Sequence, residues 1–157
     1  MKKYLIYFGC ALIFTVSCKN ESPNKDEIID DQVTANKSSL EGTWELVSFY
    51  NYIDNKVSDT IYRSENLKQI KMYTKSKVMW TKSLPSDSLE WFGYGSYEFN
   101  DSTLYEALDY GSKTMNEILK DGVEFKFKLL LEKNRFTQVE IDEDGNPIYG
   151  ENYVRIE

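Results

Sequence analysis

The sequence predicts an all-β domain, an eight-stranded antiparallel up-and-down barrel with one short helix or irregular crossing. From Leu40 to Glu157, apolar and polar residues alternate with period two, and turn-forming residues interrupt the alternation about every eight to twelve positions. The two cysteines, Cys10 and Cys18, both precede Leu40, so a disulfide framework within the domain is excluded. The chain has no histidine. Closure into a barrel is favoured because it removes exposed strand edges.

The clearest predicted strand is 123–131, where Glu124, Lys126 and Lys128 alternate with apolar residues. The other predicted strands are 42–53, 67–74, 77–84, 90–99, 102–110, 135–142 and 148–156. Their connections are short and rich in turn formers, which predicts antiparallel neighbours. The segment 112–120 is typical of a helix that could lie over a barrel end, and 54–66 receives no assignment.

One predicted hairpin suggests a ligand site. With Asn100-Asp101 as its turn, Tyr97 faces Leu104 and Gly95 faces Glu106, so an apolar face carries a single carboxylate. Such a face is typical of a small-ligand cavity. In the alternative interpretations, the glycines curve the strand and the aromatic residues fill the core. The candidate ligand-binding residues are Tyr97, Glu106, Trp80, Met72 and Phe127.

The N-terminus has the pattern of a secretion leader at 1–17, with two lysines followed by an uncharged apolar stretch. Ser17-Cys18 resembles the lipobox of bacterial lipoproteins, which implies Cys18 as the lipid attachment site. Acyl chains such as palmitate would then hold the protein on a membrane. In the alternative, Cys18 is an ordinary cysteine behind a plain secretory leader.

Residues 18–39 form a predicted flexible acidic tether with five carboxylates and no aromatic residue, and the barrel domain follows at 40–157. We expect an outer-membrane lipoprotein in the cell envelope of a Gram-negative bacterium. The side of the membrane that it faces is left open.

Composition excludes several function classes. Without histidine, imidazole bases and Ser-His nucleophiles such as one built on Ser96 are excluded. The formal charge of -7 argues against nucleic acid as a partner. We expect no cofactor, no metal site and no enzyme. The acidic run 142–146 is interpreted as a turn rather than a calcium loop, and a hydrolase using Glu98 or Glu106 with Asp109 is the weakest hypothesis. Five lysines are interpreted as a solvated surface: Lys68, Lys71, Lys75, Lys77 and Lys82.

The stretch Gly42-Thr43-Trp44 looks like the G-x-W motif of the lipocalin superfamily, and Arg155 matches the basic residue that packs across that tryptophan. Together with GTWELVSF, IKMYT, VMW, GYGSYEFNDSTLYE and ENYVRI, these motifs resemble a lipocalin-like domain of small secreted bacterial lipoproteins. The resemblance implies a calycin-type barrel that carries a small apolar ligand. We interpret Gly42, Trp44 and Arg155 as barrel-closing residues rather than recognition residues.

Two functions remain from different classes. In the preferred one, a lipid-anchored lipocalin-like barrel binds a small, mostly apolar ligand. In the alternative, a lipoprotein with a filled barrel docks an unknown protein partner through its surface or through the loops at 54–66 and 111–122. An apolar cavity of about 300 Å³ or more with a polar group would favour the first.

Overall fold

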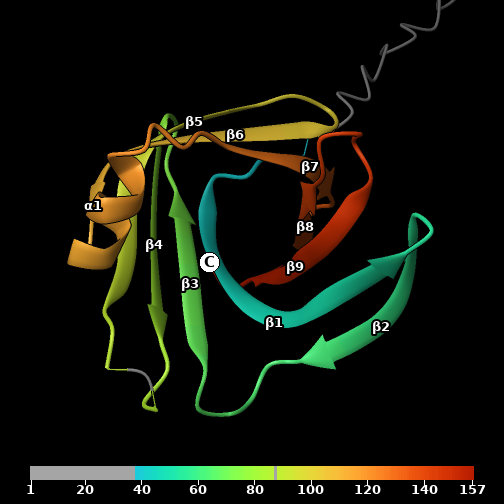
Figure 1. Cartoon of the computed structure of the whole chain (residues 1–157). Helices are drawn as coiled ribbons and strands as arrows, with labels where there is room; N and C mark the ends of the chain where they lie inside the picture. Colours follow the sequence, from blue (N-terminus) through green and yellow to red (C-terminus); the bar gives the residue numbers. More distant parts are fainter. Residues whose placement is uncertain (1–37, 87) are drawn as a thin grey trace, which may run out of the picture. The chain divides into compact units, whose positions relative to one another are not determined.

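The computed structural model describes residues 38–86 and 88–157, so the predicted leader, Cys18 and the tether up to residue 37 lie outside the described residues. One antiparallel sheet, in the order β2-β1-β3-β4-β5-β6-β7-β8-β9, closes into a ring because β1 also pairs with β9 (Figure 1). The elements are β1 (Gly42–Ile53), β2 (Lys56–Tyr62), β3 (Lys68–Tyr73), β4 (Lys77–Ser83), β5 (Trp91–Phe99), β6 (Thr103–Gly111), α1 (Lys113–Leu119), β7 (Phe125–Leu131), β8 (Arg135–Ile141) and β9 (Pro147–Arg155). The predicted all-β barrel-like fold is confirmed.

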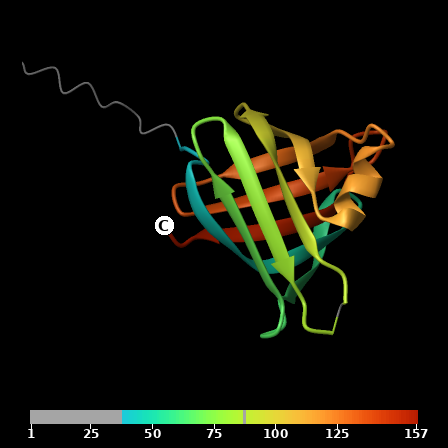
Figure 2. The same ribbon diagram turned by 90° about the vertical axis from the view of Figure 1, so that its left-hand side faces the viewer.

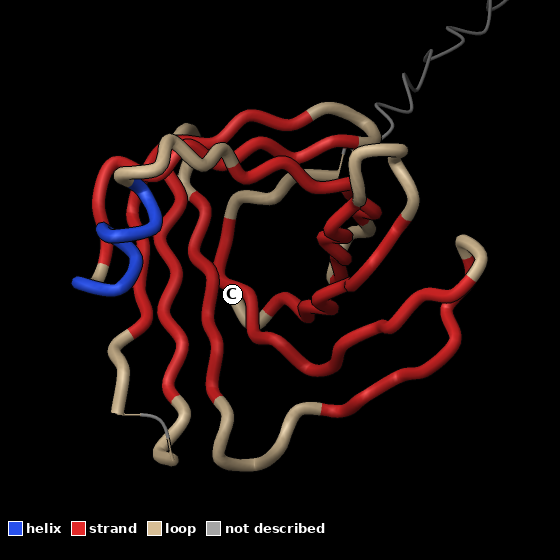
Figure 3. The backbone as a smooth tube through the Cα atoms, viewed as in Figure 1, coloured by secondary structure: helices blue, strands red, loops and turns tan. Residues whose placement is uncertain are grey.

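The described strands number nine rather than the predicted eight, and the additional one is β2. Along one edge of β1, β3 pairs near Gly42 and β2 pairs near Ile53, so β2 lies beside the ring and not in it (Figures 1 and 3). All seven β2 residues are exposed, and for that reason the segment lacks the alternation of a half-buried strand. The sequence feature that indicates β2 is the turn Asp54-Asn55, which connects β1 to β2. The positive φ angles of these two residues, 49° and 62°, suit a tight hairpin.

The two ends of the barrel differ. At the end where β1 begins and β9 finishes, the interior is filled by apolar residues, which include Leu40, Trp44 and Phe136. We call this the closed end. Figure 2 shows the C-terminus near this end and α1 toward the other. Since the strands run between the two ends, residues of one strand contribute both to a filled core and to the wall of an open lumen.

The β5–β6 hairpin has a different register from the predicted one. Tyr97 pairs with Glu106 and Gly95 with Leu108, a shift of two residues, and a bulge follows at Tyr94/Gly95. The turn is displaced by one residue, to Asp101-Ser102, because Asn100 pairs with Thr103: its backbone N–H donates to the Thr103 carbonyl at 3.0 Å and its side chain accepts from the Thr103 N–H at 2.9 Å. A shift of two preserves the faces, so Glu106 still points inward, as predicted.

The helix α1 lies within the predicted segment, and the hydroxyl of Ser112 caps it by accepting from the backbone N–H of Met115 at 3.3 Å. Met115 is buried and packs beside Gly111, where a Cβ would come within 2.7 Å of the methionine Cγ. These contacts hold α1 against β5 and β6 at the open end. Within 38–86 and 88–157, no helix has the length and apolarity needed to cross a membrane.

Candidate ligand-binding site

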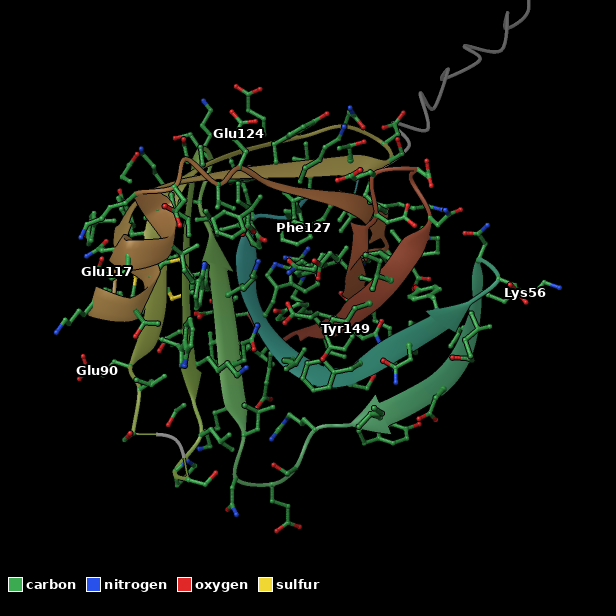
Figure 4. All side chains as sticks on the ribbon, viewed as in Figure 1. Lys56, Glu90, Glu117, Glu124, Phe127 and Tyr149 are labelled. Carbon is green, nitrogen blue, oxygen red and sulfur yellow. The ribbon has the colours of Figure 1, made fainter. Side chains whose placement is uncertain are left out.

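A pocket of about 960 Å³ occupies the half of the barrel away from the closed end. Its walls come from β3 to β9, and its rim includes Met115 of α1 and the loop 142–145. Phe127 and Tyr149 extend from different strands toward the interior of the ring (Figure 4). The volume is within the range of pockets that hold a small organic molecule.

The floor of the pocket is polar, and at its centre lies Lys71, whose side chain is 3% exposed. Lys71 Nζ donates to both carboxylate oxygens of Glu106, at 2.8 and 3.0 Å, and to Gln138 Oε1 at 2.7 Å. Three acceptors therefore match the three N–H groups of the ammonium. The hydroxyl of Tyr73 donates to Glu106 Oε1 at 2.5 Å. The ion pair is thus buried with its hydrogen bonds satisfied.

A second carboxylate, Glu151, completes the floor. Gln138 Nε2 and the Tyr153 hydroxyl each donate to Glu151 Oε2 at 2.7 Å. Gln69 Nε2 donates to Glu151 Oε1 at 3.2 Å and to the Tyr153 hydroxyl at 2.6 Å. All of these donors are neutral. Gln138 connects the two carboxylates, because its amide oxygen accepts from Lys71 while its amide nitrogen donates to Glu151.

The two tyrosines beneath the floor, Tyr73 and Tyr153, belong to the core and stay protonated. Burial, and then the charge of Glu106, raise the pKa of Tyr73 well above its ordinary value. Burial, and then the charge of Glu151, raise the pKa of Tyr153 in the same direction. Both phenols therefore act as donors to carboxylates over the whole neutral range. The charged groups of the floor are then one ammonium and two carboxylates.

Aromatic and aliphatic side chains line the walls between the floor and the rim. They include Trp80, Trp91, Leu108, Phe125, Phe127 and Tyr149. At the rim, the Asp142 carboxylate accepts from the backbone N–H and the side-chain amide of Asn146, at 2.7 and 3.1 Å, and these hydrogen bonds lower the pKa of Asp142. The acidic run 142–146 thus forms a turn, as interpreted from the sequence.

The structure brings three of the five candidate ligand residues together in this pocket: Trp80, Glu106 and Phe127. Tyr97 lies below it, where its ring packs against Tyr73 and its hydroxyl donates to the Thr74 carbonyl at 2.7 Å. Tyr97 and Glu106 do share a smaller pocket of about 260 Å³.

Met72 does not line the lumen. It is 47% exposed and lies on the outer face of β3. The prediction is wrong because the inward residues of β3 are Gln69, Lys71 and Tyr73, so that the more polar face of this strand is the buried one.

Four residues of the floor were not predicted as site residues: Gln69, Lys71, Gln138 and Glu151. The assignment of Lys71 to a solvated surface is wrong, and Lys82 also lines the pocket. The register between β1 and β3 is the feature that would have predicted the inward position of Lys71. Trp44 pairs directly with Lys71, and opposite residues share a face, so the inward position of Trp44 fixes that of Lys71.

Closure of the barrel agrees with the expectation for Trp44 and Arg155. The two residues pair between β1 and β9, and the guanidinium carbon lies 4.0 Å from the centre of the indole ring. Arg155 also donates to the carbonyls of Lys133, Glu41 and Ser39. Gly42, with φ of 132°, leaves the room that the guanidinium needs, since a Cβ there would come within 2.5 Å of Arg155 Nη1. These residues seal the closed end.

No family model matches this chain, and no curated protein matches it. Among solved structures, the chain is similar to an uncharacterized protein from Bacteroides eggerthii. The two share 17% sequence identity, and the match covers 74% of this chain and 99% of that chain with a TM-score of 0.46. We therefore base the functional proposal on the geometry of the pocket.

Proposed function

We propose that the protein is a lipid-anchored, lipocalin-like barrel of the bacterial outer membrane that binds a small, mostly apolar molecule. The observation that carries the binding proposal is the pocket of about 960 Å³, with aromatic walls above a polar floor. A ligand of this size would bury most of its apolar surface against the walls, and the floor would orient its polar group. The proposal includes no catalytic step.

The polar floor is held together by its own hydrogen bonds, which supports binding to a preformed site. Glu106 is already bound by Lys71 and Tyr73, so its carboxylate is fixed in place before any ligand enters. A preorganised site loses little conformational entropy on binding. A ligand would thus meet a rigid floor and would be selected by shape as well as by polarity.

Native mass spectrometry of the purified domain, followed by organic extraction, tests this proposal. We expect a bound small molecule that is lost in Leu108→Trp, because Leu108 lines the lumen and the larger side chain would fill it. Leu130→Trp is the matched control, since Leu130 is 50% exposed on the outer face of β7. Retention of the ligand by a folded Leu108→Trp variant would contradict binding in the lumen.

The lipid anchor is tested separately at Cys18. We expect the wild-type protein to fractionate with membranes and to carry an acyl modification, and Cys18→Ser to lose both. Intact-mass analysis reads the modification directly. A wild-type protein of unmodified mass would remove the anchor from the proposal and leave the binding function untouched.

A second candidate function is docking of a partner protein. The observation in its favour is the β1–β2 hairpin, where Ile53, Val57, Ile61 and Tyr62 are between 45% and 78% exposed. Ile61 and Tyr62 are consecutive in β2 and lie on opposite faces, so the hairpin exposes apolar side chains on both faces. Exposed apolar residues of this kind mark interaction sites in soluble proteins when a partner covers them. Alanine substitution of Ile61 and Tyr62 would abolish a docking function but leave lumen binding intact, and binding assays on that variant separate the two candidates.

A further inference from the structure

The charges of the pocket do not balance. Seven carboxylates and three lysines line it: Glu106, Glu124, Glu140, Asp142, Glu143, Asp144 and Glu151 against Lys71, Lys82 and Lys126. Most of the excess lies at the rim, where it attracts cations toward the opening. A carboxylate ligand such as a fatty acid would be repelled at the rim and again at the floor.

The imbalance reaches the deepest part of the pocket. Lys71 is matched with Glu106 by two short hydrogen bonds, which leaves Glu151 as the second carboxylate of the floor. Among the residues that the structure describes, no cationic side chain forms an ion pair with Glu151. Its three hydrogen-bond donors are neutral. A partly buried carboxylate without a countercharge favours the binding of a cation.

Beside Glu151 there is also a hydrogen-bond acceptor without a donor. Gln69 is 5% exposed and lines the pocket, and its Oε1 is buried with no hydrogen-bond partner within the described part of the chain. The orientation of this amide is fixed, because its nitrogen donates to Glu151 and Tyr153. A buried acceptor without a partner costs about 1–3 kcal/mol, so an N–H entering to this depth would be favoured.

The walls suit the same kind of group. Trp80, Trp91 and Tyr149 line the pocket between the rim and the floor. Aromatic faces attract organic cations, and the attraction increases when water is excluded. An ammonium group would therefore meet aromatic rings on its way to Glu151, and its alkyl or aryl body would remain against the apolar walls.

We propose that the ligand class of this pocket is an amphiphilic amine, with its protonated nitrogen at Glu151 and Gln69 and its apolar body against the aromatic walls. This inference rests on the proposed binding function and adds the charge of the ligand. It deepens the expectation of a mostly apolar ligand, because it assigns a cationic N–H donor to the polar end.

Three probes of equal chain length test the inference: octylamine, octanol and octanoate, measured by calorimetry at neutral pH. Octylamine is then protonated, and we expect it to bind at least about tenfold more tightly than octanoate, with octanol between them. Tighter binding of octanol or octanoate than of octylamine would overturn the amine inference but leave the binding function standing. If none of the three binds, both proposals fall.

Two single variants test whether the Glu151 carboxylate binds the protonated nitrogen of the ligand. Glu151→Gln preserves the size of the side chain and removes its charge, so we expect the preference for octylamine over octanol to fall about tenfold. Glu132→Gln, an exposed acid after β7 and outside the pocket lining, is the matched control and should leave the preference unchanged. An unchanged preference in a folded Glu151→Gln variant would overturn the assignment. If that variant does not fold, the ratio of octylamine to octanoate affinity in the wild type decides alone.

Discussion

The closed end and the open half of this barrel are built on the same strands but from different residues. At the closed end, Trp44 and Phe136 are almost fully buried and pack edge to face, with ring centres 4.9 Å apart. In the open half, the inward positions carry Lys71, Glu106 and Gln138 around a pocket. The difference indicates that one end supplies stability and the other supplies a site. Four predictions test this division, from the largest expected effect to the smallest.

The largest effect is expected where the two regions meet. Lys71→Met removes the cation from a buried pair and leaves the Glu106 carboxylate without a countercharge, so the free energy of unfolding should fall by about 3–5 kcal/mol. The double variant Lys71→Met with Glu106→Gln removes both charges and should recover most of the loss. Denaturant titration measures both variants. Equal losses in the single and the double variant would mean that the pair is not coupled.

The fully buried Trp44 and the partly buried Trp80 should respond differently to truncation. Trp44→Ala empties a fully buried position and removes a hydrogen bond of 2.7 Å to the Leu40 carbonyl, so we expect a loss of about 3–5 kcal/mol. Trp80→Ala only enlarges a pocket that already exists, and the expected loss is about 1–2 kcal/mol. Equal losses would break the division between a stabilising end and a binding half.

High pH should weaken the fold through the floor of the pocket. The pKa values of Tyr73 and Tyr153 are raised on folding, so the folded state holds two protons that the unfolded state releases above pH of about 10. Their stabilising contribution is complete below that pH. Above it, the free energy of unfolding should fall by about 1.4 kcal/mol per pH unit for each phenol, until the folded protein also ionises.

Alkaline titration of the phenol absorbance checks the same two residues. We expect late ionisation, together with unfolding, that decreases by two phenols in the double variant Tyr73→Phe with Tyr153→Phe. The late ionisation of Tyr149 should remain, because burial raises its pKa to about 12. Ionisation of all the tyrosines in one step near pH of about 10 would contradict the buried, carboxylate-bound positions of these two.

The smallest effect is expected at the closing arginine. Arg155→Ala removes the cation above Trp44 and three donors to backbone carbonyls, but the site is partly exposed, and we expect a loss of about 1–2 kcal/mol. Arg155→Lys should recover only part of it, because an ammonium cannot reproduce the planar contact. Thermal melting measures both. An unchanged melting curve for Arg155→Ala would remove its role in closure.

The predictable features of the fold were local or came from motif residues. Alternation located the ring strands to within about two residues, since one face of each is buried. Trp44 and Arg155 meet as expected from the lipocalin resemblance. The β2 strand was missed because it packs on no core, and the β5–β6 register was wrong because Asn100 pairs with Thr103 and moves the turn to Asp101-Ser102.

Much of the candidate site was not predictable from local patterns. Lysine and glutamine at inward positions oppose the rule that polar residues face water, so Lys71 was interpreted as a surface residue and Gln69 received no role. They are tolerated inside because Glu106, Gln138 and Glu151 arrive from β6, β8 and β9 to complete their hydrogen bonds. Such partners lie between 35 and 82 positions away in sequence, and only the register of the closed sheet brings them together.

Arg155 binds the segment just before β1, and this contact fixes the end of the barrel at which the chain enters the domain. The carbonyls of Ser39 and Glu41 accept hydrogen bonds from Arg155 at the closed end, whereas the pocket opens beside α1 and the loop 142–145. Whatever precedes the domain therefore joins it at the pole opposite to its entrance.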